Sequence, residues 1–458
     1  MKSLAACLTS LCMTAALMPF SWACQSEEPP RLSLSSQEDA GFIEFTLSQS
    51  PLAIAQGEAT ATTLSANLEL LSTDSTFEFI ADVASLPDGS FFILDRSAKS
   101  VIQFSEQGRR LRRIGREGGG PGEFSNPWAV AVFGEYLVVS EGRYDRPLTV
   151  FDTRTMLPMK TSTHGVPAGD WTAPAWREPV LLGLDSPFQM GPEDVTRRLG
   201  SAWDSSFIYQ LQPNERAVGL EQTSAVTPPV YLVRFDVNAD ALDTVAVLAG
   251  PQTIPQPARF QGERPRYAQP IFSPRPLWTS GSGWVAVANG TDERIVLLGN
   301  RRDTLAMIRW PRIDRPITDN DRETSARWAI EYVLREDSKT AGAWERASVS
   351  ERRSIARKQE SVMPFATTAP TVTAMYGAGN CLWIAGFAPA DYPDGTSLTW
   401  TGIDVVRGEL VGTVRVPRRD SRVRHVDEEA FYASFRDSDG LMHLERYPLP
   451  GTTCKAGS

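Results

Sequence analysis

The chain has 458 residues, of which 41 % are hydrophobic, so it is long enough to bury a large core. Its formal net charge is -9 at pH 7, from 46 basic and 55 acidic residues. A nucleic-acid-binding protein would need a basic face, and no basic stripe runs through this sequence, so its composition argues against a nucleic-acid partner.

The first 23 residues have the features of an export signal. Lys2 gives a positive start, residues 4–18 form an uncharged apolar run that is too short to span a bilayer comfortably, and residues 21–23 lead to a cleavage point. Cys24 follows directly and is a candidate lipidation site of a bacterial lipoprotein, although positions 21 and 22 depart from the usual signal. Lipidation and plain cleavage both stay open, and either places the protein in the periplasm or at the cell surface.

Residues 24–62 are predicted to tether the folded body, since their first part is rich in Ser, Gln, Glu and Pro. Residues 41–47 and 67–71 each have the pattern of a strand. We expect one of the two to complete the last sheet, because joining both ends of the chain removes open strand edges. The sequence does not decide which one does so.

The clearest repeat unit spans residues 81–124. Its apolar runs lie at 81–86, 90–94, 101–104 and 111–114, and turn residues such as Pro87-Asp88-Gly89 separate them. This order predicts a four-stranded antiparallel meander. A unit of about 45 residues cannot cover the apolar faces of such a sheet, so it needs neighbours of its own kind.

Imperfect copies follow at residues 128–152, 233–245 and 296–305. A strand-only period of about 40–50 residues indicates a β-propeller. The run at 114–124, after a strand ending at Asp95 and a turn at Gly108, resembles bacterial exported six-bladed β-propellers of the NHL-repeat-like or TolB-like kind. The resemblance is sharp over residues 78–152 and loose from there to 450.

The resemblance implies an all-β fold of six four-stranded antiparallel blades within residues 63–450, followed by a tail at 451–458. The blades are expected at 78–117, 125–163, 172–249, 268–312, 368–418 and 422–448. The third is swollen by a connection between residues 183 and 231 that includes a strand candidate at 207–211, and we expect this connection to rise over one mouth of the ring. Most members of that family have no assigned activity.

A helical insertion is predicted at 313–364, between blades four and five, where members of the family often carry one. Residues 318–321 can cap a first helix with Trp328 and Tyr332 on its apolar face, and a second helix is expected within residues 345–360. The insertion either packs on the propeller as a lid or side wall, or has no ligand role.

Three cysteines remain after the export signal: Cys24, Cys381 and Cys454. If a lipid modifies Cys24, the other two are left to pair in an oxidising compartment. The alternative is that Cys381 is a buried core thiol and that Cys454 lies in a frayed tail.

The sequence supports no catalytic site. Its histidines, His164, His425 and His443, have no metal-ligand spacing, and no Gly-x-Ser-x-Gly motif occurs. We interpret each histidine as structural and assign no catalytic, cofactor-binding or metal-binding residue. A calcium or other divalent cation held by oxygens of the channel stays open.

Three further motifs have structural interpretations. Asp95 ends a strand and Glu141 holds the matching position in the second copy, which favours a turn-stabilising role. No helix follows the glycines of residues 118–122, which argues against a phosphate-binding loop. We interpret these glycines as supplying the positive φ angles of a tight passage between two strands. The arginine cluster at residues 109–116 is interpreted as a solvated strand edge whose field is diluted by nearby acids, Glu106, Glu117 and Glu123.

Tryptophan offers the best indication of a ligand, with twelve in the chain. Most are expected to fill the wedges between blades, and a few on loops are suited to stacking on sugars or peptides. The candidates are Trp128, Trp171, Trp176, Trp278, Trp284, Trp310, Trp383 and Trp400.

The sequence therefore predicts an exported, monomeric propeller that serves as a binding scaffold for a protein, peptide or glycan. Membrane contact is expected only through an N-terminal lipid. The alternative function is a channel-centred, metal-dependent hydrolase or lyase of the lactonase or amidating-lyase type. Whether the protein is an enzyme is left open, with the balance against it, and no substrate is named.

Overall fold

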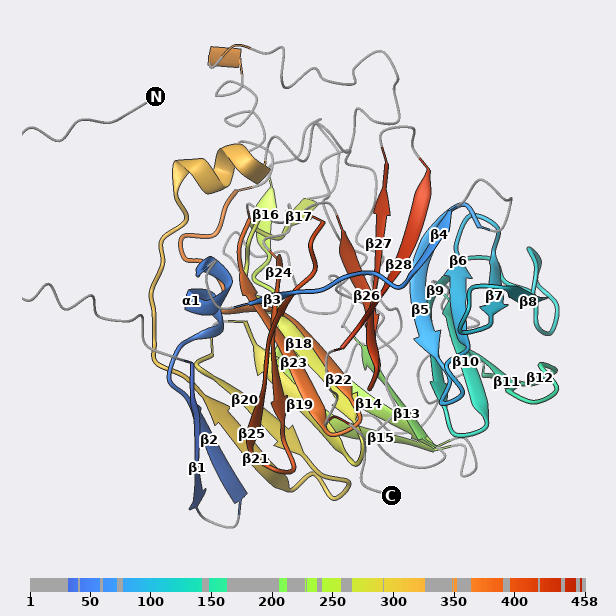
Figure 1. The fold of residues 1–458 in the computed structure, drawn as a ribbon, viewed down its shortest axis with the longest axis horizontal. Helices are drawn as coiled ribbons and strands as arrows, with labels where there is room; N and C mark the ends of the chain where they lie inside the picture. Colours follow the sequence, from blue (N-terminus) through green and yellow to red (C-terminus); the bar gives the residue numbers. More distant parts are fainter. Residues whose placement is uncertain are drawn as a thin grey trace, which may run out of the picture. The chain divides into compact units, whose positions relative to one another are not determined.

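The computed structural model describes most of residues 32–454, and the description is discontinuous. The described ranges are 32–39, 42–57, 61–71, 77–141, 148–162, 206–211, 227, 229–236, 241–256, 266–290, 292–325, 348, 350–351, 364–389, 396–418, 421–437, 441–449 and 454. The predicted export signal and Cys24 lie outside these ranges. The described chain is predominantly β-strand and forms antiparallel sheets (Figure 1).

Sheet 1 matches the repeat unit closely. Its strands are β5 (Ile80–Ser85), β6 (Phe91–Asp95), β7 (Ser100–Phe104) and β8 (Arg110–Ile114), paired in chain order. The first turn forms because Gly89 adopts a φ of 81° and Asp88 Oδ1 accepts a hydrogen bond of 2.9 Å from the Ser90 amide. Local turn chemistry therefore sets the register of the first hairpin.

Five more sheets follow along the described chain. Sheet 2 contains β9 (Pro127–Phe133), β10 (Tyr136–Glu141), β11 (Leu148–Asp152) and β12 (Pro158–Ser162), and sheet 3 contains β13 (Ser206–Leu211), β14 (Pro229–Asp236) and β15 (Ala241–Ala249). Sheet 4 contains β18 (Pro276–Gly281), β19 (Trp284–Asn289), β20 (Arg294–Leu298) and β21 (Thr304–Arg309). Sheet 5 contains β22 (Val372–Ala378), β23 (Cys381–Phe387), β24 (Thr396–Asp404) and β25 (Glu409–Arg415), and sheet 6 contains β26 (Arg422–Val426), β27 (Ala430–Arg436) and β28 (Met442–Pro448). A separate pair, β16 (Ile254–Gln256) and β17 (Arg266–Ala268), lies in the connection between sheets 3 and 4.

Buried apolar clusters join each sheet to its neighbours. Phe92 and Val130 belong to one cluster between sheets 1 and 2, Val150 and Val233 to another between sheets 2 and 3, and further clusters join sheets 3 and 4 and sheets 5 and 6. β18 contacts β22, which joins sheets 4 and 5. Sheet 6 packs on sheet 1 through a cluster that contains Phe91, and the stacked Phe91 and Phe104 rings lie 5.6 Å apart within it. The series of contacts therefore returns to its starting sheet.

The N-terminal segment adds strands to the outer edges of sheets 4, 5 and 6 (Figure 1, blue). β2 (Phe42–Leu47) pairs in parallel with β21 and carries β1 (Leu34–Asp39) on its other side, and β3 (Thr62–Thr63) pairs in parallel with β25. β4 (Leu68–Leu71) pairs antiparallel with β28. The second of the two candidate segments therefore completes sheet 6, whereas the first extends sheet 4.

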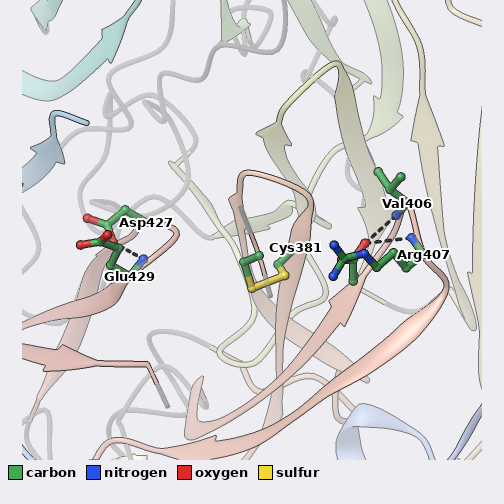
Figure 2. The surroundings of a disulfide bond; sticks show 7 residues. Cys381, Val406, Arg407, Asp427 and Glu429 are labelled. Carbon is green, nitrogen blue, oxygen red and sulfur yellow. Dashed lines mark hydrogen bonds and ion pairs between the residues drawn. A yellow bond between two sulfur atoms is a disulfide. The ribbon is translucent and has the colours of Figure 1, made fainter. Parts of the chain in front are cut away.

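A disulfide joins Cys381 to Cys454, with their Cα atoms 5.1 Å apart. It fixes the C-terminal tail to the start of β23, and the Asn380 amide donates a 3.1 Å hydrogen bond to the Cys454 carbonyl. Figure 2 shows the bridge between two turns, one at Asp427 and Glu429 and the other at Val406 and Arg407. The sequence left open whether Cys381 and Cys454 pair or stay separate, and in the structure they pair.

Of the predicted helical insertion at 313–364, the structure describes residues 313–325, 348, 350–351 and 364. Residues 319–325 are helical, and Thr318 caps them, because Asp321 N–H donates to Thr318 Oγ1 at 3.3 Å and Thr318 N–H donates to Asp321 Oδ2 at 2.8 Å. The same reciprocal cap joins Ser348 and Glu351 ahead of the second helix. Trp328, Tyr332 and the other residues of the two predicted helices that fall within 326–347, 349 and 352–363 lie outside the described residues.

Candidate functional site

The connections at the two edges of the sheets differ in length. At one edge, short turns join first strands to second strands and third strands to fourth strands, as at 86–90, 282–283, 379–380 and 405–408. At the other edge, several strand ends are separated by longer stretches of sequence, as between residues 211 and 229, 249 and 276, and 309 and 372. We call this second edge the long-connection edge. Long connections carried by a rigid scaffold are common places for binding residues.

At this edge, β-bulges interrupt the first strands of four sheets. The extra residue is Ala81 in β5, Trp128 in β9, Thr373 in β22 and Arg424 in β26. Bulges turn a side chain away from the regular alternation and often lie beside functional sites. Sequence reasoning named Trp128 as a candidate but missed the bulges themselves, because a bulge depends on the pairing of two strands and not on local composition.

Two of the four bulged residues carry notable side chains. The Arg96 guanidinium lies 3.4 Å from the centroid of the Trp128 ring, which gives a cation–π contact between sheets 1 and 2. Arg424 is half-buried, and its side chain donates to Ser434 Oγ at 2.8 Å and to the Ala81 carbonyl at 3.2 Å. Both of these acceptors are neutral. Among the described residues, no carboxylate forms an ion pair with Arg424.

Polar side chains connect consecutive first strands. Gly377 N–H donates to Thr279 Oγ1 at 2.7 Å between sheets 4 and 5, and Tyr376 donates to the Val423 carbonyl at 2.8 Å between sheets 5 and 6. Between sheets 1 and 2, Val130 N–H donates to Asp82 Oδ2 at 3.0 Å. Together with the Arg424 contact to Ala81, these bonds hold the first strands of adjacent sheets in fixed positions.

Ser85 and His425, which are 340 residues apart, share a hydrogen bond of 2.9 Å between Oγ and Nε2. Desolvation lowers the pKa of His425, and the charge of Asp427 acts in the opposite direction without overcoming it. His425 is therefore a neutral imidazole at pH 7, positioned between β26 and β5. Its sequence context gives no signal of this contact.

The other described histidine has both ring nitrogens occupied. His443 Nδ1 lies 2.9 Å from Glu69 Oε1, Nε2 lies 2.7 Å from Asp437 Oδ2, and the ring stacks on Phe435. His443 lies on β28, which is the third strand of its sheet, because β4 occupies the outer position. His443 thus has a structural role, and His164 lies outside the described residues.

The repeated acids satisfy backbone amides. Asp95 accepts hydrogen bonds from the amides of Glu78 at 2.8 Å and Phe79 at 3.2 Å, and Glu141 accepts from the amides of Ser125 at 2.6 Å and Asn126 at 3.2 Å. In both sheets the acid at the end of the second strand therefore fixes the chain that leads into the first strand. Asp95 and Glu141 therefore stabilise the local backbone, as the sequence predicted.

The glycine-rich loop has a structural role, and the described tryptophans are largely buried. Gly118 and Gly122 adopt positive φ angles, and the Gly120 amide donates to Glu123 Oε2 at 2.8 Å, which folds the loop on itself. The described candidate tryptophans are at most 9 % exposed: Trp128, Trp278, Trp284, Trp310, Trp383 and Trp400. Trp171 and Trp176 lie outside the described residues.

Neither a metal cluster nor a membrane-spanning helix is found in the part of the chain that the structure describes. No group of three or more His, Cys, Asp or Glu side chains there is arranged to hold a metal ion. Among the same residues, no helix has both the length and the apolar character needed to cross a membrane.

No protein-family model and no curated protein sequence matches the chain. Among solved structures, the chain is similar to a DUF4221-family protein from Bacteroides vulgatus, with 10 % identity, a TM-score of 0.46 and coverage of 85 % of this chain and 99 % of that one. It is also similar to regucalcin, a calcium-binding protein from Agrobacterium tumefaciens, with 8 % identity, a TM-score of 0.37 and coverage of 87 % and 98 %. Virginiamycin B lyase from Staphylococcus aureus gives 9 % identity, a TM-score of 0.37 and coverage of 83 % and 98 %.

Proposed function

We propose that the protein is an exported six-bladed β-propeller whose long-connection edge binds a protein, peptide or glycan. The export signal at residues 1–23 supports the location outside the cytoplasm. The six sheets support the number of blades, because each contacts the next along the chain and sheet 6 contacts sheet 1.

A bulge that recurs in the outer strands of successive sheets supports the view that the blades are copies of one repeat unit. In sheets 1 to 5 the outer strand carries a bulge, and the extra residue is apolar each time: Leu111, Met159, Val245, Leu305 and Val411. A recurring irregularity at one structural position is expected of repeats that share a backbone.

The main support for a binding function is the difference between the short-turn edge and the long-connection edge of the sheets. Short turns close one edge, whereas the other combines long connections with bulged first strands that carry half-buried Arg424 and Trp128, which is 9 % exposed. An aromatic ring, together with an arginine that has no carboxylate partner among the described residues, suits a ligand with planar or apolar groups and an anionic group.

The test uses a chain that begins at residue 25, which omits the predicted export signal and Cys24, and a panel of peptides and cell-envelope oligosaccharides, with binding measured by biolayer interferometry. For a ligand found in this way, Arg424→Gln and Trp128→Phe are expected to weaken binding about tenfold, equivalent to about 1.4 kcal/mol. Arg407→Gln is the matched control, because Arg407 is exposed at the short-turn edge. An equal loss in the control, or turnover of the ligand by protein with stoichiometric metal, would contradict the proposal.

A further inference from the structure

The outer strand of sheet 1 is unusually basic. Arg109, just before β8, and Arg110, Arg112 and Arg113 within it are all exposed, and we call these four residues the β8 arginine strip. Arg112 Nε donates to Gln103 Oε1 at 2.7 Å and Arg113 Nη2 donates to the Ala98 carbonyl at 2.9 Å. Within the described residues, none of the four pairs with a carboxylate.

The acids expected to neutralise this cluster are engaged elsewhere. Glu117 forms an ion pair with Lys99, and Glu123 forms one with Arg116 at 2.8 Å. Glu106 accepts a hydrogen bond from Gln107, and its charge also acts on Arg446. In a chain with a net charge of -9, four exposed arginines in or just before one strand, without acidic partners among the described residues, create a local positive field.

The same strand has an open hydrogen-bonding edge. β8 is the outermost strand of its sheet (Figure 1), and in the described structure only β7 pairs with it. The corresponding outer strands of sheets 4 and 5 each accept an added strand from the N-terminal segment, β2 and β3 respectively, in parallel orientation. The outer edges of these sheets are therefore suited to strand addition. β8 offers an edge of the same kind, and no added strand among the described residues covers it.

We propose that β8 binds an acidic, extended polypeptide segment of a partner, which pairs as an additional strand and places its carboxylates against the β8 arginine strip. Arg110 and Arg113 lie opposite Phe104 and Ile102, whereas Arg112 lies opposite Gln103 on the other face of the sheet. A matching segment therefore needs consecutive acids, because alternate residues of a strand face opposite sides.

The choice of an acidic polypeptide follows from both features together. Arginine binds carboxylates through paired hydrogen bonds, and an open strand edge offers amides and carbonyls at the spacing of another backbone. Basic side chains on an edge strand repel basic strands, and their loss of hydration disfavours pairing with neutral ones, so they favour acidic partners. The proposal concerns the outer strand of sheet 1 and depends neither on the number of blades nor on the long-connection edge.

The test measures fluorescence anisotropy of a labelled peptide that contains a run of glutamates, with the same peptide carrying glutamines as the neutral control. The mature protein is expected to bind the acidic peptide, with affinity that falls as salt is raised, and not the neutral one. Replacing the whole strip in the variant R109Q/R110Q/R112Q/R113Q is expected to weaken binding about tenfold or more.

A matched variant removes four arginines elsewhere: R154Q/R301Q/R302Q/R312Q. Arg154, Arg302 and Arg312 already pair with Glu135, Asp243 and Asp314, so this variant is expected to bind like the wild type. Far-UV circular dichroism and thermal melting establish that both variants fold. Equal binding by the wild type and the strip variant would overturn the proposal.

Two further measurements separate strand pairing from charge alone. A peptide with the same glutamates and methyl groups on consecutive backbone nitrogens keeps its charge and has neither edge free to pair, so it is expected to bind more weakly. Equal binding of the methylated peptide would overturn strand addition. Strip-dependent binding to phosphatidylglycerol vesicles without binding to the acidic peptide would show a membrane-facing surface and would also overturn the proposal.

Discussion

At the scale of single residues, Asp321 is a buried carboxylate with a complete set of partners. Its two oxygens accept hydrogen bonds from Arg315 Nη2 and Nη1, both at 2.9 Å, and Oδ2 also accepts from the Thr318 amide and hydroxyl at 2.8 Å. Only 2 % of the Asp321 side chain is exposed. Burial acts to raise the pKa of Asp321, but the hydrogen bonds from Arg315 and Thr318 outweigh it and hold the pKa below 3.8.

We expect Asp321→Asn to lower the free energy of unfolding at pH 7 by about 1.5–3 kcal/mol, because it removes a charged acceptor from Arg315. The folded-state pKa is depressed, so this stabilisation is present above 3.8 and is lost as the pH falls below 3.8 toward the folded-state value. Denaturant unfolding at pH 7 and at progressively lower pH measures both effects. A difference between wild type and variant that stayed constant down to low pH would contradict this account.

Asp314→Asn is the matched control. Asp314 pairs with Arg312 at 3.1 Å, but both side chains are more than two-thirds exposed, so solvent screens the pair. We expect the control to change stability by less than about 0.5 kcal/mol at pH 7.

At the scale of elements, helix α1 (Pro51–Gln56) connects β2 to β3 and packs directly on β23. Ser50 caps it, accepting a 3.2 Å hydrogen bond from Ala53 N–H, and Leu52 enters a cluster with Phe272 and Phe387. Gly386 makes the close approach possible, because a Cβ there would lie 2.1 Å from the Pro51 carbonyl oxygen.

Gly386→Ala is therefore expected to destabilise the protein by about 1–3 kcal/mol, since the atom it would meet belongs to the backbone of α1. Gly57→Ala, at the end of the same helix, is the control: its Cβ would meet Ala53 O at an ordinary 3.5 Å, and we expect a change below about 0.5 kcal/mol. Urea unfolding of both variants measures the difference. Equal effects would show that α1 can shift to make room for the added methyl group.

The elements also show what the sequence could predict. The four strands of sheet 1 lie within one residue of the predicted runs, because apolar alternation and the turn at Gly89 are local signals. The parallel pairing of β2 with β21 joins segments more than 200 residues apart, and no local pattern specifies it. The contact of Ser85 with His425 and the bulge at Arg424 were missed for the same reason, since both arise from tertiary pairing.

At the scale of the whole molecule, the disulfide between Cys381 and Cys454 closes a loop with a sequence separation of 73. The chain-entropy model gives about 4 kcal/mol for a loop of this size, through restriction of the unfolded chain. We expect Cys381→Ser with Cys454→Ser to lower the melting temperature by several degrees under oxidising conditions. Reductant should lower the melting temperature of the wild type toward that of the variant, and no effect of reductant on the wild type would contradict a stabilising bridge.

The chain ends meet in sheet 6, where β4 from the N-terminal segment pairs with β28 near the C-terminus. Leu68 and Leu70 of β4 pack against the cluster that joins sheet 6 to sheet 1, so β4 both covers the edge of β28 and seals that junction. A chain beginning at residue 77 lacks β4, whereas a chain beginning at residue 61 keeps it together with β3.

We expect the longer truncated chain to unfold in one cooperative transition and the shorter one to lose cooperativity and aggregate, because an unpaired β28 edge and a part of the apolar cluster become exposed. Circular dichroism melting and size-exclusion chromatography distinguish the two outcomes. A chain from residue 77 that melted as sharply as the chain from residue 61 would mean that the contacts between sheets 6 and 1 hold without the closing strand. In that case the N-terminal segment would act only as a cover for outer edges.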